Sequence, residues 1–118
     1  MRLCSPRLGG AVVALGLFVS AVATAAPVGA SEPLKVELHK LRICESGDNY
    51  RADTGNGYYG GLQMDLTFQR SYGSFLLRSK GTANRWTPYE QMWVAERAYE
   101  SGRGFYPWPN TARSCGLI

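Results

Sequence analysis

A stripe of leucines in polar surroundings predicts the first helix of the chain. Leu34, Leu38 and Leu41 are spaced i, i+4 and i+7, which places them on one face of a helix. Ser31 is a suitable N-cap before this stripe, and Gly47 is a typical stop signal after it. We therefore expect an amphipathic helix between Ser31 and Gly47 that buries its leucine face.

A second helix is marked by its capping residues. Thr87 is a suitable N-cap, Pro88 suits the first helical position, and Glu90 completes a capping box. Gly102 is expected to end the helix, and the aromatic, proline-rich residues 105–109 are expected to pack across the domain. The residues predicted on the buried face of this helix are Met92, Ala95 and Tyr99, with Trp93 beside them.

The chain between these helices is rich in glycine and tyrosine. Within residues 48–61, Gly55-Asn56-Gly57 supplies turn conformations, so the flanking segments are expected to pair as a small hairpin. A short helix is expected over residues 62–72, and residues 73–86 are expected to form a connection with one helical turn. The predicted fold class is therefore α+β, mainly helical, with a short β-hairpin.

The N-terminus has the pattern of an export signal. Arg2 and Arg7 precede an apolar run over residues 11–26 that contains Ala23-Thr24-Ala25, a small-x-small cleavage sequence. This run of about sixteen residues is shorter than the roughly 20 residues of a spanning helix. We predict a secretory signal peptide over residues 1–25, and a retained membrane anchor is the competing interpretation.

The remaining chain divides into a linker and one domain. Residues 26–33 are expected to form a short linker, with signal cleavage after Ala30 as an alternative, and residues 34–118 are expected to form a single domain. An exported domain has an oxidising environment. Cys44 and Cys115 are then expected to be paired, against the alternative of two buried free thiols.

Composition and charge exclude several classes of protein. The 118 residues are 45% hydrophobic and 19% charged, which argues against a disordered chain, a collagen-like repeat and a coiled coil. The net charge is +4, and two of the thirteen Lys and Arg residues lie in the acid-free first ten residues. The excess is too small and too scattered for a nucleic-acid partner. Since His39 is the single histidine and two cysteines are expected to pair, no metal and no cofactor are expected.

Glu45 is the residue with the strongest chemical signal. It occupies the next position on the leucine stripe, near the C-terminal end of the predicted helix. Partial desolvation and the negative end of the helix dipole both favour the protonated carboxyl and raise its pKa. A carboxyl that stays protonated toward neutral pH suits a general acid that cleaves a glycosidic bond. The alternative is a partly buried glutamate without a catalytic role.

Two long motifs resemble those of a known family. The first is Cys44-Glu45-Ser46-Gly47-Asp48-Asn49-Tyr50, continued by Thr54-Gly55-Asn56-Gly57-Tyr58-Tyr59-Gly60-Gly61-Leu62-Gln63. The second is Glu90-Gln91, Val94-Ala95-Glu96-Arg97 and Gly102-Arg103-Gly104, followed by a tryptophan-proline pair before a cysteine. The sequence from about residue 34 to 116 resembles the transglycosylase-like family, which includes the catalytic domain of actinobacterial resuscitation-promoting factors.

The resemblance implies a compact lysozyme-like fold that binds and cleaves peptidoglycan between N-acetylmuramic acid and N-acetylglucosamine. Glu45 matches the catalytic glutamate, and Cys44 and Cys115 match a disulfide pair. Domain 34–118 would then be the transglycosylase-like catalytic domain, acting as a lytic transglycosylase or a muramidase. The positions that would bind substrate are Asn49, Asp53, Thr54, Asn56, Tyr58 and Gln63.

The expected partners and location follow from the same resemblance. Peptidoglycan glycan strands are the expected partner, another wall hydrolase is a candidate second partner, and the protein is expected to be a monomer secreted to the cell wall. Phe68-Gln69 stands where the family often has threonine-tryptophan, so part of the sugar-binding wall is expected to differ. The competing class is a non-catalytic wall-binding or signalling module.

Overall fold

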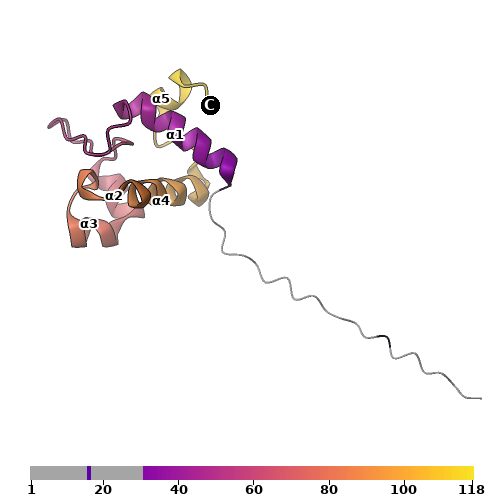
Figure 1. The fold of residues 1–118 in the computed structure, drawn as a ribbon, viewed down its shortest axis with the longest axis horizontal. Helices are drawn as coiled ribbons and strands as arrows, with labels where there is room; N and C mark the ends of the chain where they lie inside the picture. Colours follow the sequence, from indigo (N-terminus) through magenta and orange to yellow (C-terminus); the bar gives the residue numbers. More distant parts are fainter. Residues whose placement is uncertain (1–15, 17–30) are drawn as a thin grey trace, which may run out of the picture.

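The computed structural model of the protein describes Gly16 and residues 31–118 (Figure 1). The predicted signal peptide, apart from Gly16, and most of the predicted linker lie outside the described residues. Within the described part, no helix is both long and apolar enough to cross a membrane.

Helix α1 (Glu32–Ser46) forms where the leucine stripe predicted it. The Ser31 side chain accepts a hydrogen bond from the backbone N–H of Leu34 at 3.4 Å, and Gly47 ends the helix with a left-handed φ of 63°. Leu34, Leu38 and Leu41 are all buried. The predicted boundaries and the predicted buried face of this helix are confirmed.

Helix α4 (Pro88–Ala98) begins at the predicted capping box, which is fully formed between Thr87 and Glu90. It continues into a short π-helical segment, η2 (Tyr99–Arg103), in which Gly102 leaves helical geometry with a φ of 99°. The ends of the helix are therefore close to those predicted.

The predicted buried face of α4 is correct in part. Ala95 is buried, and the partly buried Met92 and Tyr99 pack against the core, but Trp93 is 41% exposed. The face that packs inward is Gln91, Val94, Ala95 and Ala98. Gln91 is polar, yet it can be buried on this face because its side-chain amide forms hydrogen bonds with backbone groups. A pattern of hydrophobic residues does not predict the burial of such a residue.

Short helices complete the domain. The helix expected over residues 62–72 begins only at Leu66, because the Asp65 carboxylate caps it by accepting a hydrogen bond from the Phe68 N–H at 2.7 Å. The connection that follows is more helical than expected. These elements are α2 (Leu66–Tyr72), α3 (Ser74–Lys80), the 3-10 turn η1 (Ala83–Arg85) and α5 (Pro109–Ser114).

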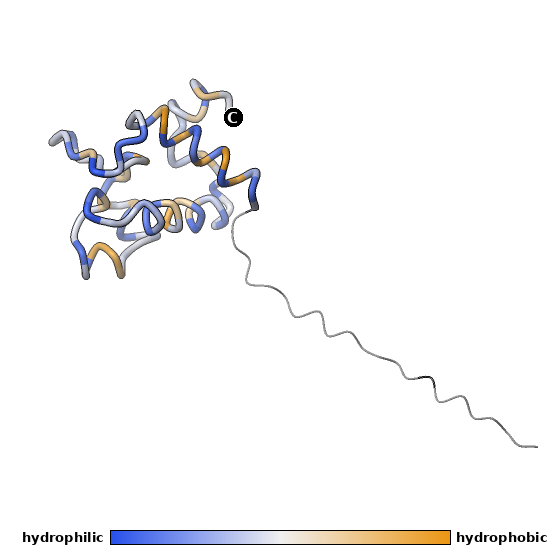
Figure 2. The backbone as a smooth tube through the Cα atoms, viewed as in Figure 1, coloured by the Kyte–Doolittle hydropathy of each residue, from blue (hydrophilic) through white to orange (hydrophobic). Residues whose placement is uncertain are grey.

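The helices pack around one hydrophobic core. α4 contacts α1, α2 and η2, while α5 lies against α1 (Figure 1). Apolar and polar positions alternate along α1 in the hydropathy view (Figure 2). The C-terminal aromatic segment contributes Phe105 and Trp108, each 5% exposed, so this segment packs across the domain as predicted.

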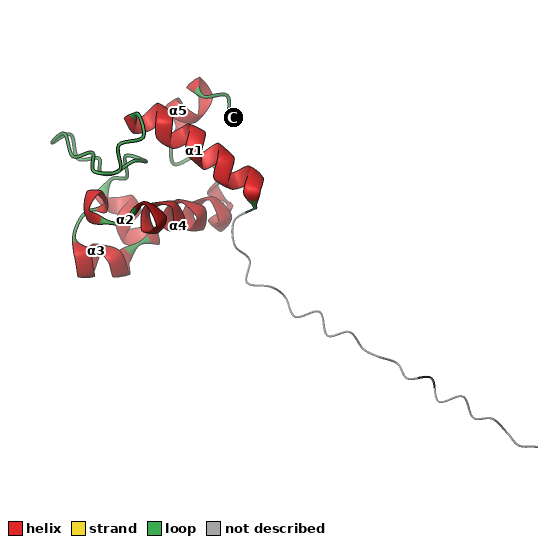
Figure 3. Cartoon of the chain, in the orientation of Figure 1, coloured by secondary structure: helices red, strands yellow, loops and turns green. Residues whose placement is uncertain are grey.

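The expected hairpin is not shown in the glycine-rich loop between α1 and α2. Residues 47–65 contain two isolated antiparallel bridges, Asp53–Tyr59 and Tyr59–Met64, and no strand is drawn within the described residues (Figure 3). Gly55 and Gly57 have positive φ angles, as turns require. Since Tyr59 takes part in both bridges, the loop folds back twice over too few residues to form a ladder.

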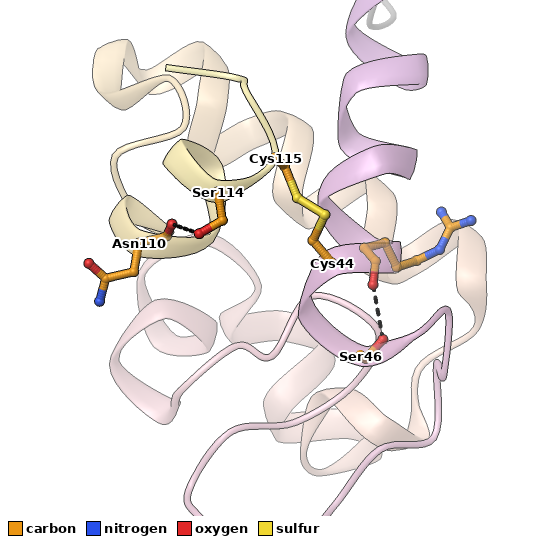
Figure 4. Close-up of a disulfide and its surroundings, with 6 residues drawn as sticks. Cys44, Ser46, Asn110, Ser114 and Cys115 are labelled. Atoms are coloured by element: carbon orange, nitrogen blue, oxygen red, sulfur yellow. Dashed lines mark hydrogen bonds between the residues drawn. A yellow bond between two sulfur atoms is a disulfide. The ribbon is translucent and has the colours of Figure 1, made fainter.

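A disulfide joins the last turn of α1 to the C-terminal segment. Cys44 in the last turn of α1 is bonded to Cys115, which follows α5, with a Cα–Cα distance of 6.6 Å (Figure 4). Ser114 closes α5 by donating from its hydroxyl to the Asn110 carbonyl at 3.0 Å. The predicted pairing is confirmed, and it fixes α5 beside the end of α1.

Removing the disulfide should lower the free energy of unfolding by about 2–4 kcal/mol, because the bridge closes a 71-residue segment in the unfolded chain. Urea unfolding of the oxidised protein, the reduced protein and the Cys44→Ala/Cys115→Ala variant measures this loss. The reduced protein and the double variant should agree with each other. Free thiols at both positions in the oxidised protein would contradict the pairing.

Candidate active site

Glu45 lies half-buried at the end of the leucine stripe of α1, four residues after Leu41. Its side chain faces an open groove of about 350 Å³. The loop between α1 and α2 forms one wall of this groove, and the C-terminal segment forms the other. The lining residues are Glu45, Asn56, Tyr58, Gln63, Pro107, Trp108, Pro109, Asn110 and Thr111.

Trp108 connects the two walls of the groove. Its indole N–H donates to the Leu62 carbonyl at 2.7 Å, and its ring packs on Phe68 with 5.2 Å between ring centroids. A buried tryptophan whose N–H is satisfied has a fixed orientation. The C-terminal wall is therefore held directly against the loop that forms the opposite wall.

The loop wall is shaped by local side-chain to backbone hydrogen bonds. The Asn56 amide oxygen accepts from the Tyr58 N–H at 3.0 Å, and Gln63 donates from its amide to the Gly60 carbonyl at 3.0 Å. Gln63 also has a positive φ of 48°, uncommon for a residue other than glycine. These contacts place the Tyr58 ring, 47% exposed, at the mouth of the groove.

Burial raises the pKa of Glu45 above its ordinary value, because the half-buried carboxylate loses part of its hydration. A hydrogen bond with the Thr111 side chain acts in the opposite direction by stabilising the charged form. The direction of the shift agrees with the expectation from the stripe. Glu45 can therefore hold a proton at a higher pH than an exposed glutamate while remaining open to a ligand in the groove.

The predicted substrate-binding residues divide into two groups. Asn56, Tyr58 and Gln63 line the groove with Glu45. Asn49, Asp53 and Thr54 are exposed and do not line it. Their local geometry suits loop formation: the Asn49 side chain accepts from the Arg51 N–H at 3.0 Å, and Asp53 forms a bridge with Tyr59.

Sequence reasoning missed the second wall of the groove. The sequence predicts that residues 105–109 pack across the domain, but it does not predict that residues 107–111 line a groove with Glu45. The available signal was the disulfide. A bond between Cys44 and Cys115 brings the residues before Cys115 to the end of α1, where Glu45 lies.

The fold and the groove define a class of small helical domain, tied by one disulfide, that presents a half-buried carboxyl to an open groove with an aromatic wall. The transglycosylase-like domain model matches residues 33–111, more than half of the chain, and the protein belongs to this family. The matched range contains every residue that lines the groove.

The chain is also similar to several resuscitation-promoting factors. It is 35% identical over 111 residues to Rpf1 of Corynebacterium glutamicum, covering 94% of this chain and 54% of the relative. It is 40% identical over 78 residues to RpfE of Mycobacterium tuberculosis, covering 66% and 42%. RpfC of Mycobacterium tuberculosis is 30% identical over 116 residues, covering 98% and 77%. The chain spans about half the length of the first two relatives.

Replacing Thr111 by valine should raise the pKa of Glu45 further, because the hydroxyl that stabilises the charged carboxylate is lost while the side-chain volume is kept. The pH titration of the Glu45 carboxyl carbon, followed by NMR, measures the change. Thr54→Val is the matched control, because Thr54 does not line the groove, and it should leave the Glu45 pKa unchanged. An unchanged or lower pKa in Thr111→Val would contradict the assignment.

Proposed function

We propose that this protein is a secreted enzyme with a lysozyme-like arrangement that cleaves peptidoglycan between N-acetylmuramic acid and N-acetylglucosamine. The observation that carries the proposal is the half-buried Glu45 carboxyl, with a raised pKa, facing an aromatic-walled groove. Membership of the transglycosylase-like family and similarity to resuscitation-promoting factors support the same substrate. The site of action would be the cell wall, outside the membrane.

Glu45 would act first as an acid and then as a base. Its proton passes to the glycosidic oxygen, and the bond from that oxygen to the anomeric carbon of the muramyl residue breaks. The resulting carboxylate then takes a proton from the muramyl 6-hydroxyl or from a water molecule, whose oxygen forms the new bond to the anomeric carbon. The second step returns a proton to Glu45, which is then ready for the next turnover.

The groove walls offer contacts that suit a chain of N-acetylated sugars. Tyr58, 47% exposed, presents aromatic surface against which a pyranose ring can pack, while the buried Trp108 supports the wall behind it. The side-chain amides of Asn56, Gln63 and Asn110 line the same groove and can exchange hydrogen bonds with acetamido groups and hydroxyls. An open groove, rather than a closed pocket, also suits cleavage within a long strand.

The distribution of carboxylates supports a route that uses one acid. Two-carboxylate glycosidases place the second acid about 5–9.5 Å from the first, across the sugar ring. Among the described residues that line the groove, Glu45 is the sole carboxylate. Asp48 pairs with Arg42 at 2.5 Å, Asp65 caps α2, and Asp53 lies outside the groove lining. The 6-hydroxyl of the muramyl residue would then supply the attacking oxygen.

Glu45→Gln should reduce release of soluble muropeptides from purified peptidoglycan by at least about 100-fold, because the amide keeps the shape but donates no catalytic proton. Chromatography of the soluble fraction measures the release, and cosedimentation with peptidoglycan shows that binding is kept. A variant that retains turnover would remove Glu45 from the role of acid. Binding without release in the natural protein would instead favour the non-catalytic wall-binding module.

The folding control for Glu45→Gln follows from the raised pKa. Because the folded-state pKa of Glu45 lies above its unfolded value, the stability this group contributes is present below the unfolded pKa and is lost as the pH rises through the folded pKa. Glutamine does not ionise. The variant should therefore be at least as stable as the natural protein at neutral pH, as measured by urea unfolding.

The product should carry a 1,6-anhydromuramyl end, because the single-acid route closes the ring through the 6-hydroxyl. Mass spectrometry identifies this fragment, which is lighter by one water than the corresponding reducing-end product. Asp53→Asn should leave both the rate and the product type unchanged. Dominant reducing ends that disappear in Asp53→Asn would identify a two-carboxylate hydrolase instead.

A further inference from the structure

A second hollow, of about 150 Å³, continues the groove away from Glu45. The two hollows share part of their lining, formed by Tyr58, Gln63, Pro107 and Trp108. Beyond this shared wall, the second hollow reaches Thr67 and Ser71 on α2 and Arg103 at the end of η2. A strand that lies across Glu45 can therefore extend toward Arg103.

Arg103 is an exposed cation at the rim of this second hollow. Its guanidinium lies 3.4 Å from the Tyr72 hydroxyl, and no ion pair with a carboxylate is formed by Arg103 within residues 31–118. Gly102 and Gly104 flank it with positive φ angles of 99° and 55°, which hold the chain in a tight turn at the rim. The guanidinium is thus available to an incoming anion.

Asp65 is the acidic residue in the lining of this hollow, and it forms no ion pair with Arg103. The Asp65 carboxylate accepts a hydrogen bond from the Phe68 N–H at 2.7 Å and caps α2. The Thr67 hydroxyl lines the same hollow and can donate a hydrogen bond to a ligand there, whereas the Ser71 hydroxyl already donates to the Thr67 carbonyl at 2.9 Å. Arg103 uses one guanidinium N–H on the Tyr72 hydroxyl, and its remaining N–H groups can bind a carboxylate, which an arginine fork holds with two parallel hydrogen bonds.

We propose that this second hollow is a subsite for a carboxylate carried on the muramyl residues of the strand, with Arg103 as its specificity-determining residue. The inference rests on the proposed function, since it assumes that a glycan strand occupies the groove. Muramyl residues carry a lactyl ether whose carboxyl is either free or extended by a peptide stem with its own carboxylates. The subsite would therefore distinguish peptidoglycan from neutral polymers of N-acetylglucosamine.

Binding of three ligands tests this subsite, using the full oxidised protein with Glu45→Gln so that no ligand is consumed. The ligands are neutral N-acetylglucosamine oligosaccharides, glycan strands freed of their stems, and strands that keep their stems. Calorimetry should show tighter binding of the anionic strands than of the neutral oligosaccharide. Salt at about 1 M, where the Debye length is about 3 Å, should remove most of that difference.

Adding Arg103→Gln should weaken binding of the anionic strands about three- to tenfold and leave the neutral oligosaccharide unaffected. Arg103→Lys should keep most of the preference, because the charge is retained. Arg97→Gln is the matched control: it removes the same charge from an exposed arginine that packs over Trp93 and does not line the groove. Its affinities should stay at the parent values.

The two sources of the carboxylate give different results. A loss confined to stem-bearing strands identifies a stem carboxylate, whereas a loss with stem-free strands as well identifies the lactyl carboxylate. An unchanged affinity in Arg103→Gln, an equal loss for the neutral oligosaccharide, or an equal loss in Arg97→Gln would overturn the subsite. Failure of the proposed function shows separately, as absence of turnover by the natural protein.

Discussion

The glycine-rich loop that forms the groove is held in place by two buried side-chain amides rather than by a sheet. Gln91 is fully buried in α4; it accepts from the Gly61 N–H at 2.8 Å and donates to the carbonyls of Tyr50 and Trp86. Gln69 is fully buried in α2 and bonds the Met64 carbonyl and the Ala83 N–H. Backbone groups without a ladder must find other partners, and these amides supply them.

The position of Glu45 depends on this anchored loop. Because Gln91 and Gln69 fix both ends of the loop, the Leu62 carbonyl is in place to accept from the Trp108 indole. The disulfide then holds the residues after Trp108 beside α1, which leaves Glu45 covered on one side and open on the other. A fully buried carboxyl would be inaccessible and a fully exposed one would not have its pKa raised by burial, so half-burial suits the proposed chemistry.

Local signals were enough to predict some parts of the structure. The ends of α1 and α4 depend on capping residues close in sequence, and both were correctly placed. The raised pKa of Glu45 followed from its position on a helical stripe. The burial of Gln91 was not predictable, because its partner Gly61 lies 30 residues away and polarity argues for the surface. The C-terminal groove wall was missed for the same reason. The hydrogen bond from Trp108 to Leu62 joins residues 46 positions apart, and such a contact produces no periodic pattern of hydrophobic residues in the sequence.

Phe68 and Gln69, which stand where the family often has threonine and tryptophan, contribute mainly to the packing and hydrogen bonding beneath the groove. Gln69 is fully buried and lines neither hollow, so an altered sugar-binding wall stays a prediction that concerns Phe68. Phe68 lines the second hollow and packs its ring against Trp108 and Tyr72. The chemistry that a ligand meets is therefore set by the loop and by the C-terminal segment, while α2 supplies the packing and the amide bonds that keep those two segments at a fixed separation.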